Sequence, residues 1–235
     1  MAASPGPREL VDLFGGHPSQ VLGLELALGG DQDRWLLAAC LLSQRGGEAR
    51  ALEGFRVLMA RDLSAPERVA EAPEQLAPAL DAAGWCDPEV PALLLARAAR
   101  GLCGSGGSEQ LAREAEGLEE LGGRLAGLAP GFGRAAVARF LRPLRDHWPA
   151  AAEIPLSRAA RAAALHLGWI ADGEDEEGEP GALRARLRGE PDAPALADVE
   201  AALERLGSAA CLRGATRRCP LRARCPARAV PNAAG

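Results

Sequence analysis

The stretch Leu128-Ala-Pro-Gly-Phe-Gly-Arg-Ala-Ala-Val137 decides how this chain is interpreted. Its pattern predicts the end of one helix, a tight glycine turn and the start of a second helix. Such a turn points backbone N–H groups and a helix N-terminus outward, where they can hold a phosphate without reading a base sequence. The stretch therefore predicts a contact with a nucleic-acid backbone. An ordinary helix–helix turn is the alternative, because Pro-Gly is common in turns.

The composition favours an all-α fold. The chain has a single threonine, two isoleucines and no tyrosine, so the residues that favour strands are nearly absent. Ala, Leu, Glu and Arg, which favour helices, are abundant instead. The 235 residues are enough for one large domain or two small lobes with a sizeable core.

Apolar periodicity predicts most of the helices and their limits. A break is expected near Gly122-Gly123, and a loop is expected over 173–194 with a short helix near 183–187. Ser64-Ala-Pro-Glu67 has the form of a capping box with proline near the start, which predicts a helix beginning there.

The charge is unevenly distributed. A formal net charge of −5 argues only against a strongly basic coat for nucleic acid. After Leu206 the chain carries six arginines and no acid: Arg213, Arg217, Arg218, Arg222, Arg224 and Arg228. This block predicts a local anionic partner, and a solvated basic face is the equally weighted alternative.

No apolar stretch is long enough to span a bilayer, and the N-terminus lacks the basic and apolar regions of a signal peptide. We therefore expect a cytoplasmic protein, associated with the nucleoid if it is bacterial. In that reducing compartment the cysteines are expected to serve metal binding or core packing rather than disulfides.

Together with the order of the surrounding helices, Trp148-Pro149 and the C-terminal cysteines, the quoted stretch resembles the helix-hairpin-helix of the endonuclease III superfamily of DNA glycosylases. The resemblance covers roughly Leu36 to Cys225. It implies a two-lobed all-α fold that binds duplex DNA between its lobes. The hairpin residues implied to contact DNA are Pro130, Gly131, Phe132, Gly133 and Arg134. The family's usual hairpin reads Leu-Pro-Gly-Val-Gly, and this chain has an additional Ala129.

Two further positions follow from the resemblance by counting from Gly133. Bifunctional members have a lysine where this chain has Ala135, so the resemblance implies no Schiff-base lyase activity. The catalytic aspartate of the superfamily corresponds to Glu153, whose carboxylate would stabilise charge at the sugar and orient water. Arg158 also falls on a position where the family commonly has arginine. Alternatively, Glu153 is a helix N-terminal acid that interacts with the dipole of the helix from Ser157 to Leu167.

The resemblance also implies a residue that fills the space left by an extruded base. In this chain that position follows Leu41-Leu42-Ser43, where Arg45 is in register and Gln44 is its neighbour. A polar helix end before the Gly46-Gly47 break is the alternative reading.

The C-terminal cysteines have a related but incomplete pattern. The family's iron–sulfur loop has four cysteines, and this chain offers Cys211, Cys219 and Cys225, with Thr216 near the position of the missing one. The resemblance implies a [4Fe–4S] cluster with an incomplete cysteine set. Zinc bound by three cysteines and a histidine is a weaker alternative, because His166 is well removed in sequence. The other cysteines, Cys40, Cys86 and Cys103, are expected in the core.

The implied activity is that of a monofunctional DNA glycosylase, which hydrolyses the N-glycosidic bond of a damaged or mispaired base. The alternative is a DNA-damage or DNA-structure binding protein without catalysis, since Ala135, Glu153 and the missing cysteine all depart from the family pattern. A helical interaction protein without a DNA role is a third hypothesis, supported by the net acidic charge. The expected partner is duplex DNA, bound by a monomer without a membrane.

The expected organisation has four parts. These are an N-terminal segment over 1–33 that packs on the second lobe, a helical lobe over 34–145 with the hairpin at 118–144, a second lobe over 146–206, and a Cys/Arg-rich tail over 207–235.

Overall fold

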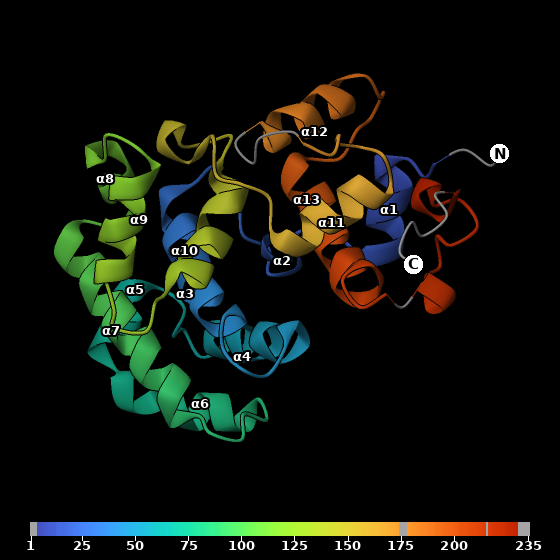
Figure 1. The fold of residues 1–235 in the computed structure, drawn as a ribbon. Helices are drawn as coiled ribbons and strands as arrows, with labels where there is room; N and C mark the ends of the chain where they lie inside the picture. Colours follow the sequence, from blue (N-terminus) through green and yellow to red (C-terminus); the bar gives the residue numbers. More distant parts are fainter. Residues whose placement is uncertain (1–3, 174–177, 215, 230–235) are drawn as a thin grey trace. The chain divides into compact units, whose positions relative to one another are not determined.

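The computed structural model describes residues 4–173, 178–214 and 216–229, and every regular element within them is helical (Figure 1). None of the described residues lies in a strand, which confirms the prediction of an all-α protein. The α-helices are α1 (Pro7–Phe14), α2 (Pro18–Val21), α3 (Gly29–Leu42), α4 (Glu48–Ala60), α5 (Pro66–Glu71), α6 (Leu76–Ala82), α7 (Glu89–Ser105), α8 (Ser108–Glu114), α9 (Leu118–Gly127), α10 (Arg134–Leu141), α11 (Arg158–His166), α12 (Glu179–Arg188) and α13 (Leu196–Leu206). The shorter turns are η1 (Pro73–Gln75), η2 (Arg142–Leu144), η3 (Pro149–Ala151), η4 (Gly207–Cys211, a π-helical turn), η5 (Thr216–Arg218) and η6 (Pro226–Ala229).

One predicted helix break is wrong. Helix α9 runs through Gly122 and Gly123, and the chain is interrupted earlier, at 115–117. Each glycine costs about 1 kcal/mol in a helix. Leu121 and Leu125 are fully buried, and burial of each leucine stabilises the fold by about 1.5–3 kcal/mol. The burial of the leucines therefore outweighs the cost of the glycines.

The predicted capping box is also wrong in its details. Helix α5 begins where expected, but its N-cap is Ala65, and no side chain caps it. Pro66 occupies the first helical position, where a missing N–H costs nothing. The loop predicted over 173–194 contains the whole of α12, because Leu183 and Leu187 are buried on one side of it.

Contacts divide the chain into two compact units: unit 1 comprises 1–17 and 153–235, and unit 2 comprises 18–152. In unit 2, α3 is the central helix and contacts α4, α7, α8 and α10. Its segment 35–41 is almost completely buried. The indole Nε1 of Trp35 donates a buried hydrogen bond to the carbonyl of Phe140, 3.1 Å away, and thereby connects α3 to α10.

Unit 1 is built around α11 and α13, with α1 packed against α13. Small residues allow the backbones to approach closely: a Cβ on Gly207 would lie only 1.9 Å from the carbonyl oxygen of Ala159. Arg205 in α13 donates to the carbonyl oxygens of Phe14, Gly15 and Gly16, at 2.8–3.0 Å. These bonds satisfy carbonyl groups that the end of α1 would otherwise leave without partners.

Within the described residues, no helix combines the length and the apolar character that crossing a bilayer requires.

Asp33 of α3 holds the start of α8 in unit 2. Its Oδ1 accepts a hydrogen bond from the backbone N–H of Ser108 at 2.8 Å and another from the Ser108 hydroxyl. Ser108 is fully buried, so these donors depend on Asp33. Burial raises the pKa of Asp33, the bonds from Ser108 lower it, and the nearby Glu67 and Glu109 raise it further, with a net upward shift.

Because the pKa of Asp33 is higher in the folded chain than in the unfolded chain, its contribution to stability is greatest below the unfolded pKa. That contribution is lost as the pH rises through the folded pKa. We expect Asp33→Asn, which retains an acceptor, to increase the free energy of unfolding at neutral pH. The variant should also show a weaker decrease of stability as the pH rises from acid to neutral. Asp33→Ala leaves the N–H and hydroxyl donors of Ser108 without their acceptor and should lower the free energy of unfolding by about 1–3 kcal/mol. Thermal unfolding from pH 3 to 8 measures both effects, and a less stable Asp33→Asn at neutral pH would contradict the assignment.

Candidate nucleic-acid interface

The stretch 128–137 contains a tight turn between α9 and α10 in unit 2. Gly131 has a φ of +101°, a conformation that favours glycine. Phe132 is 1% exposed, and its N–H bonds to the carbonyl of Ala129 at 3.0 Å. Gly133 is extended, with φ −78° and ψ 176°, and is the N-cap of α10. The predicted helix–turn–helix geometry is therefore present.

Helix α7 provides the surface on which this turn is seated. A Cβ on Gly101 would lie 2.7 Å from the carbonyl oxygen of Leu128, so the two backbones touch only because Gly101 has no side chain. The Leu94 side chain lies under Gly131, 3.7 Å from the position that a Cβ there would occupy. Ala129, the residue added relative to the family motif, is fully buried and small enough to fit. Nothing local in the sequence distinguishes Gly101 and Leu94 as contacts of the turn.

The outer side of the turn can accept an anion. Gly131, Gly133, Arg134 and Ala135 are exposed. The backbone N–H groups of Gly133, Arg134 and Ala135 have no protein acceptor in the described part of the chain. The first turn of α10 contains no acidic residue that could occupy this position. Free amides and the positive end of the helix dipole together favour a phosphate oxygen here.

Gln44 and Arg45 follow α3, and the structure distinguishes between them. The Gln44 side chain is partly buried and donates to the carbonyl of Cys40 at 3.4 Å, so it folds back on its own helix. Arg45 is exposed and has no hydrogen bond or ion pair among the described residues. The next two glycines have φ values of +156° and +82°, which turn the chain sharply. Arg45 is thus the more accessible of the two predicted DNA contacts.

Glu153 and Arg158 belong to unit 1. The Glu153 carboxylate is exposed and has no bonding partner within residues 4–173, 178–214 and 216–229. It does not cap α11: the N-cap is Ser157, whose Oγ accepts from the N–H of Ala160 at 3.1 Å. Arg158 is the first residue of α11 and is exposed. The interaction of Glu153 with the dipole of α11 stays a prediction, as does its catalytic role.

The predicted metal ligands all lie in unit 1 and are partly exposed. Cys211 and Cys219 pack against its apolar core, and the Cys225 thiol donates to the carbonyl of His166 at 3.5 Å. The backbone carbonyl of His166 is therefore next to Cys225 despite the separation of the two residues in sequence. No three histidine, cysteine or acidic side chains in the described part are gathered closely enough to hold a metal ion. With three thiols where four are needed, this donor set does not fit a [4Fe–4S] cluster.

Protein contacts also hold the tail. Leu221 is 1% exposed within the core of unit 1, and Arg224 forms a two-pronged ion pair with Glu9 of α1. Of the remaining cysteines, Cys40 is buried as expected, but Cys86 and Cys103 are exposed. The expectation that all three lie in the core is wrong, because Cys103 lies on the exposed face of α7 and Cys86 lies in an exposed bend between α6 and α7.

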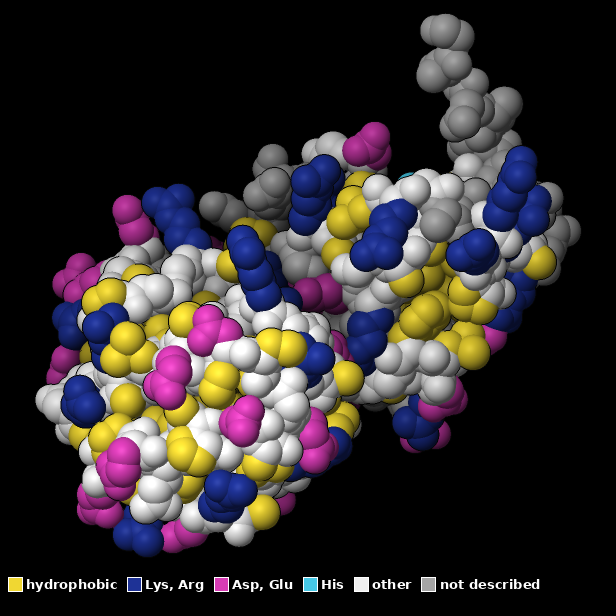
Figure 2. All heavy atoms as spheres, turned by 90° about the horizontal axis from the view of Figure 1, so that it is seen from below, with side chains coloured by type: hydrophobic (Ala, Val, Ile, Leu, Met, Phe, Trp, Pro, Cys, Tyr) yellow, Lys and Arg dark blue, Asp and Glu magenta, His cyan; other side chains and the backbone are white. Residues whose placement is uncertain are grey.

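Arginines and acids are interspersed on the face shown in Figure 2, where no continuous basic surface is visible. The sequence concentrates six arginines after Leu206. Of these arginines, Arg213, Arg217, Arg218 and Arg222 are exposed.

Comparison with known proteins gives no match: no family model, no curated protein and no solved structure is significantly similar to this chain.

The contact between α7 and the hairpin can be tested with two glycines of the same helix. Gly101→Ala places a methyl group against the Leu128 carbonyl and should destabilise unit 2 by about 1–3 kcal/mol. Gly104→Ala is the matched control, since a Cβ there meets nothing within 4 Å. Thermal unfolding of the two variants provides the comparison. Equal stabilities would show that the hairpin does not depend on this close approach.

Proposed function

We propose that this protein binds duplex DNA through the hairpin of unit 2, and that it is a monofunctional DNA glycosylase of the base-excision type. The observation that carries the proposal is the exposed turn whose three consecutive N–H groups lack a protein acceptor at the start of α10. Contacts of this kind position a protein on the DNA backbone and carry no sequence information. Exposed arginines at positions 45, 134 and 158 would add contacts to phosphate.

The chemistry assigned to Glu153 is hydrolysis without a covalent amine intermediate. Ala135, where a bifunctional enzyme would have lysine, ends in a methyl group and cannot attack the sugar. A carboxylate at the sugar would stabilise the developing positive charge and accept a proton from the attacking water. The exposed Glu153 carboxylate, which has no protein partner in the described segments, is available for that role.

A second candidate is a DNA-binding protein that performs no chemistry. It is favoured by the same feature of Glu153, because no described side chain or amide orients its carboxylate. Catalytic groups depend on precise positioning, and small displacements can lower a rate by orders of magnitude. Both candidates share the hairpin contact and differ only at Glu153.

The hairpin contact can be tested by removing one N–H group. Arg134→Pro removes the amide at the first helical position, where proline fits, and the extended Gly133 before it is compatible with proline. Arg134→Ala is the control, because it removes the same charge and retains the amide. We expect Arg134→Ala to lower the salt slope of duplex binding by about 1. Arg134→Pro should weaken binding by a further tenfold or more, on the order of 1.5–3 kcal/mol.

Fluorescence anisotropy with a labelled duplex across a salt series measures these effects, and the two variants should unfold at similar temperatures. Indistinguishable affinities would mean that the amide does not contact DNA.

Catalysis can be tested by measuring base release from duplexes that each carry one lesion or mismatch, with alkali cleavage to reveal abasic sites. We expect release from at least one duplex and a loss of about 10²–10⁴-fold in Glu153→Gln with binding retained. Asp12→Asn, which alters another exposed carboxylate of unit 1, should leave the rate unchanged. Binding without release from any duplex would instead support the non-catalytic candidate.

A further inference from the structure

The exposed face of α7 lies directly beside the hairpin in unit 2 (Figure 1). Two positions of α7 contact the hairpin: Gly101 meets the Leu128 carbonyl, and Leu94 lies under Gly131. These two positions are two helical turns apart, which is about 10 Å along the axis of α7. Arg97 follows Leu94 by three positions and precedes Gly101 by four, so it lies on the same side of the helix. Its side chain therefore emerges beside the turn.

Nothing in the described part of the chain occupies the Arg97 side chain. Arg97 is exposed, and it has no hydrogen bond or ion pair among the described residues. One turn and two turns earlier in α7, Leu93 and Val90 are 51% and 56% exposed, so this face of the helix is uncovered. An uncovered face that carries an unpaired cation is complementary to an anionic partner.

The same part of unit 2 presents the free amides of the hairpin. Gly131 is seated over Leu94, which is one turn of α7 from Arg97. The N–H groups without a protein acceptor begin two residues after Gly131, at Gly133. A guanidinium can donate two parallel hydrogen bonds to one phosphate. Successive phosphates of a strand are about 3.4 Å apart along the axis of a duplex, so a strand held at the amides brings further phosphates to α7.

We propose that α7 extends the DNA-binding surface of the hairpin, and that the Arg97 guanidinium holds the backbone phosphate next to the one bound by the amides of α10. This inference rests on the proposed function, because it places Arg97 at the same duplex. The contact carries no base sequence information. Its effect is positional: one phosphate contact leaves a duplex free to pivot, and a second contact fixes the direction of the strand across unit 2.

Arg100 provides a control on the same helix. It is exposed and lies on the side of Cys103, which follows it by three positions. Burial and the negative charges of Glu67 and Asp33 raise the pKa of the Cys103 thiol, so the surroundings on this side of α7 are acidic. A phosphate is repelled there, and Arg100 is therefore excluded from the proposed contact.

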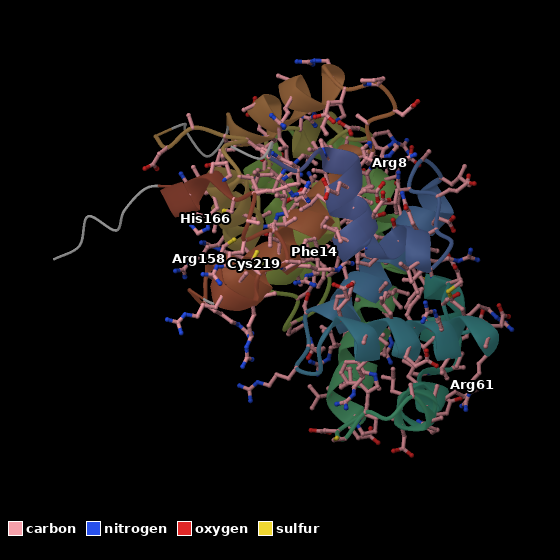
Figure 3. All side chains as sticks on the ribbon, turned by 90° about the vertical axis from the view of Figure 1, so that its right-hand side faces the viewer. Arg8, Phe14, Arg61, Arg158, His166 and Cys219 are labelled. Atoms are coloured by element: carbon pink, nitrogen blue, oxygen red, sulfur yellow. The ribbon has the colours of Figure 1, made fainter. Side chains whose placement is uncertain are left out.

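The test compares Arg97→Gln with Arg100→Gln and Arg61→Gln in the full chain, by fluorescence anisotropy of a labelled duplex across a salt series. Each variant removes one exposed positive charge from unit 2. Arg61 follows α4, which packs on α3 and α6, and Figure 3 shows it at the edge of the molecule. We expect Arg97→Gln to weaken binding about tenfold and to lower the salt slope by about 1. The two control variants should bind like the unchanged chain.

Two further variants test the kind of contact and its place. Arg97→Lys retains the charge and should retain the salt slope, while the loss of the two-pronged geometry lowers the affinity. Arg97→Gln combined with Arg134→Pro should lose affinity by the product of the two single losses, because the groups hold different phosphates. Since Arg97 has no partner in the described segments, Arg97→Gln should unfold at the same temperature as the unchanged chain.

An unchanged salt slope in Arg97→Gln overturns the inference. Equal losses in all three glutamine variants also overturn it, because they would reflect net charge alone. A combined variant that binds no more weakly than Arg134→Pro overturns the assignment to a second phosphate. The hairpin is tested separately by Arg134→Pro against Arg134→Ala: a difference between these two, with unchanged binding by Arg97→Gln, refutes the role of α7 and leaves the proposed function intact.

Discussion

Contact between two backbones at a glycine is the constraint on which the rest of this structure depends. In unit 2, Gly101 allows α7 to touch the carbonyl of Leu128, which fixes the start of the hairpin. In unit 1, Gly207 touches the carbonyl of Ala159 in the same way and sets the distance between η4 and α11. A chain with 3% aromatic residues cannot fill wide gaps between helices, so it packs them closely through glycine and alanine. The hairpin and the cysteine segment are thus both positioned by residues that carry no chemistry.

The electrostatic character of the molecule is local. Its formal net charge is −5, and several ion pairs, such as those of Arg68 and Arg124 with neighbouring acids, lie on the surface and add little stability. Against this background two features stand out, namely the three amides at the start of α10 and the acid-free tail. An anionic partner would therefore be held at a few points, with a shallow dependence on salt.

The tail shows how a segment rich in arginine and proline can be ordered. Leu221 is buried in the core of unit 1, and Arg224 pairs with Glu9, where the hydrogen bond from Arg224 lowers the pKa of the carboxyl. These two contacts attach the middle of the segment to α1 and the core.

The sequence by itself determined the all-α fold, because a chain nearly free of β-branched and aromatic residues has little with which to build a sheet. It also determined the turn at Gly131, since the local pattern of proline and glycine decides that conformation. It could not place the break before α9, because α9 continues through Gly122 and Gly123 only where Leu121 and Leu125 are buried against other helices. The roles of Glu153, Arg45 and the hairpin in DNA binding stay predictions. Only the tertiary structure brought Gly101 to Leu128 and His166 to Cys225, because these contacts join residues whose separation in the chain gives no local signal.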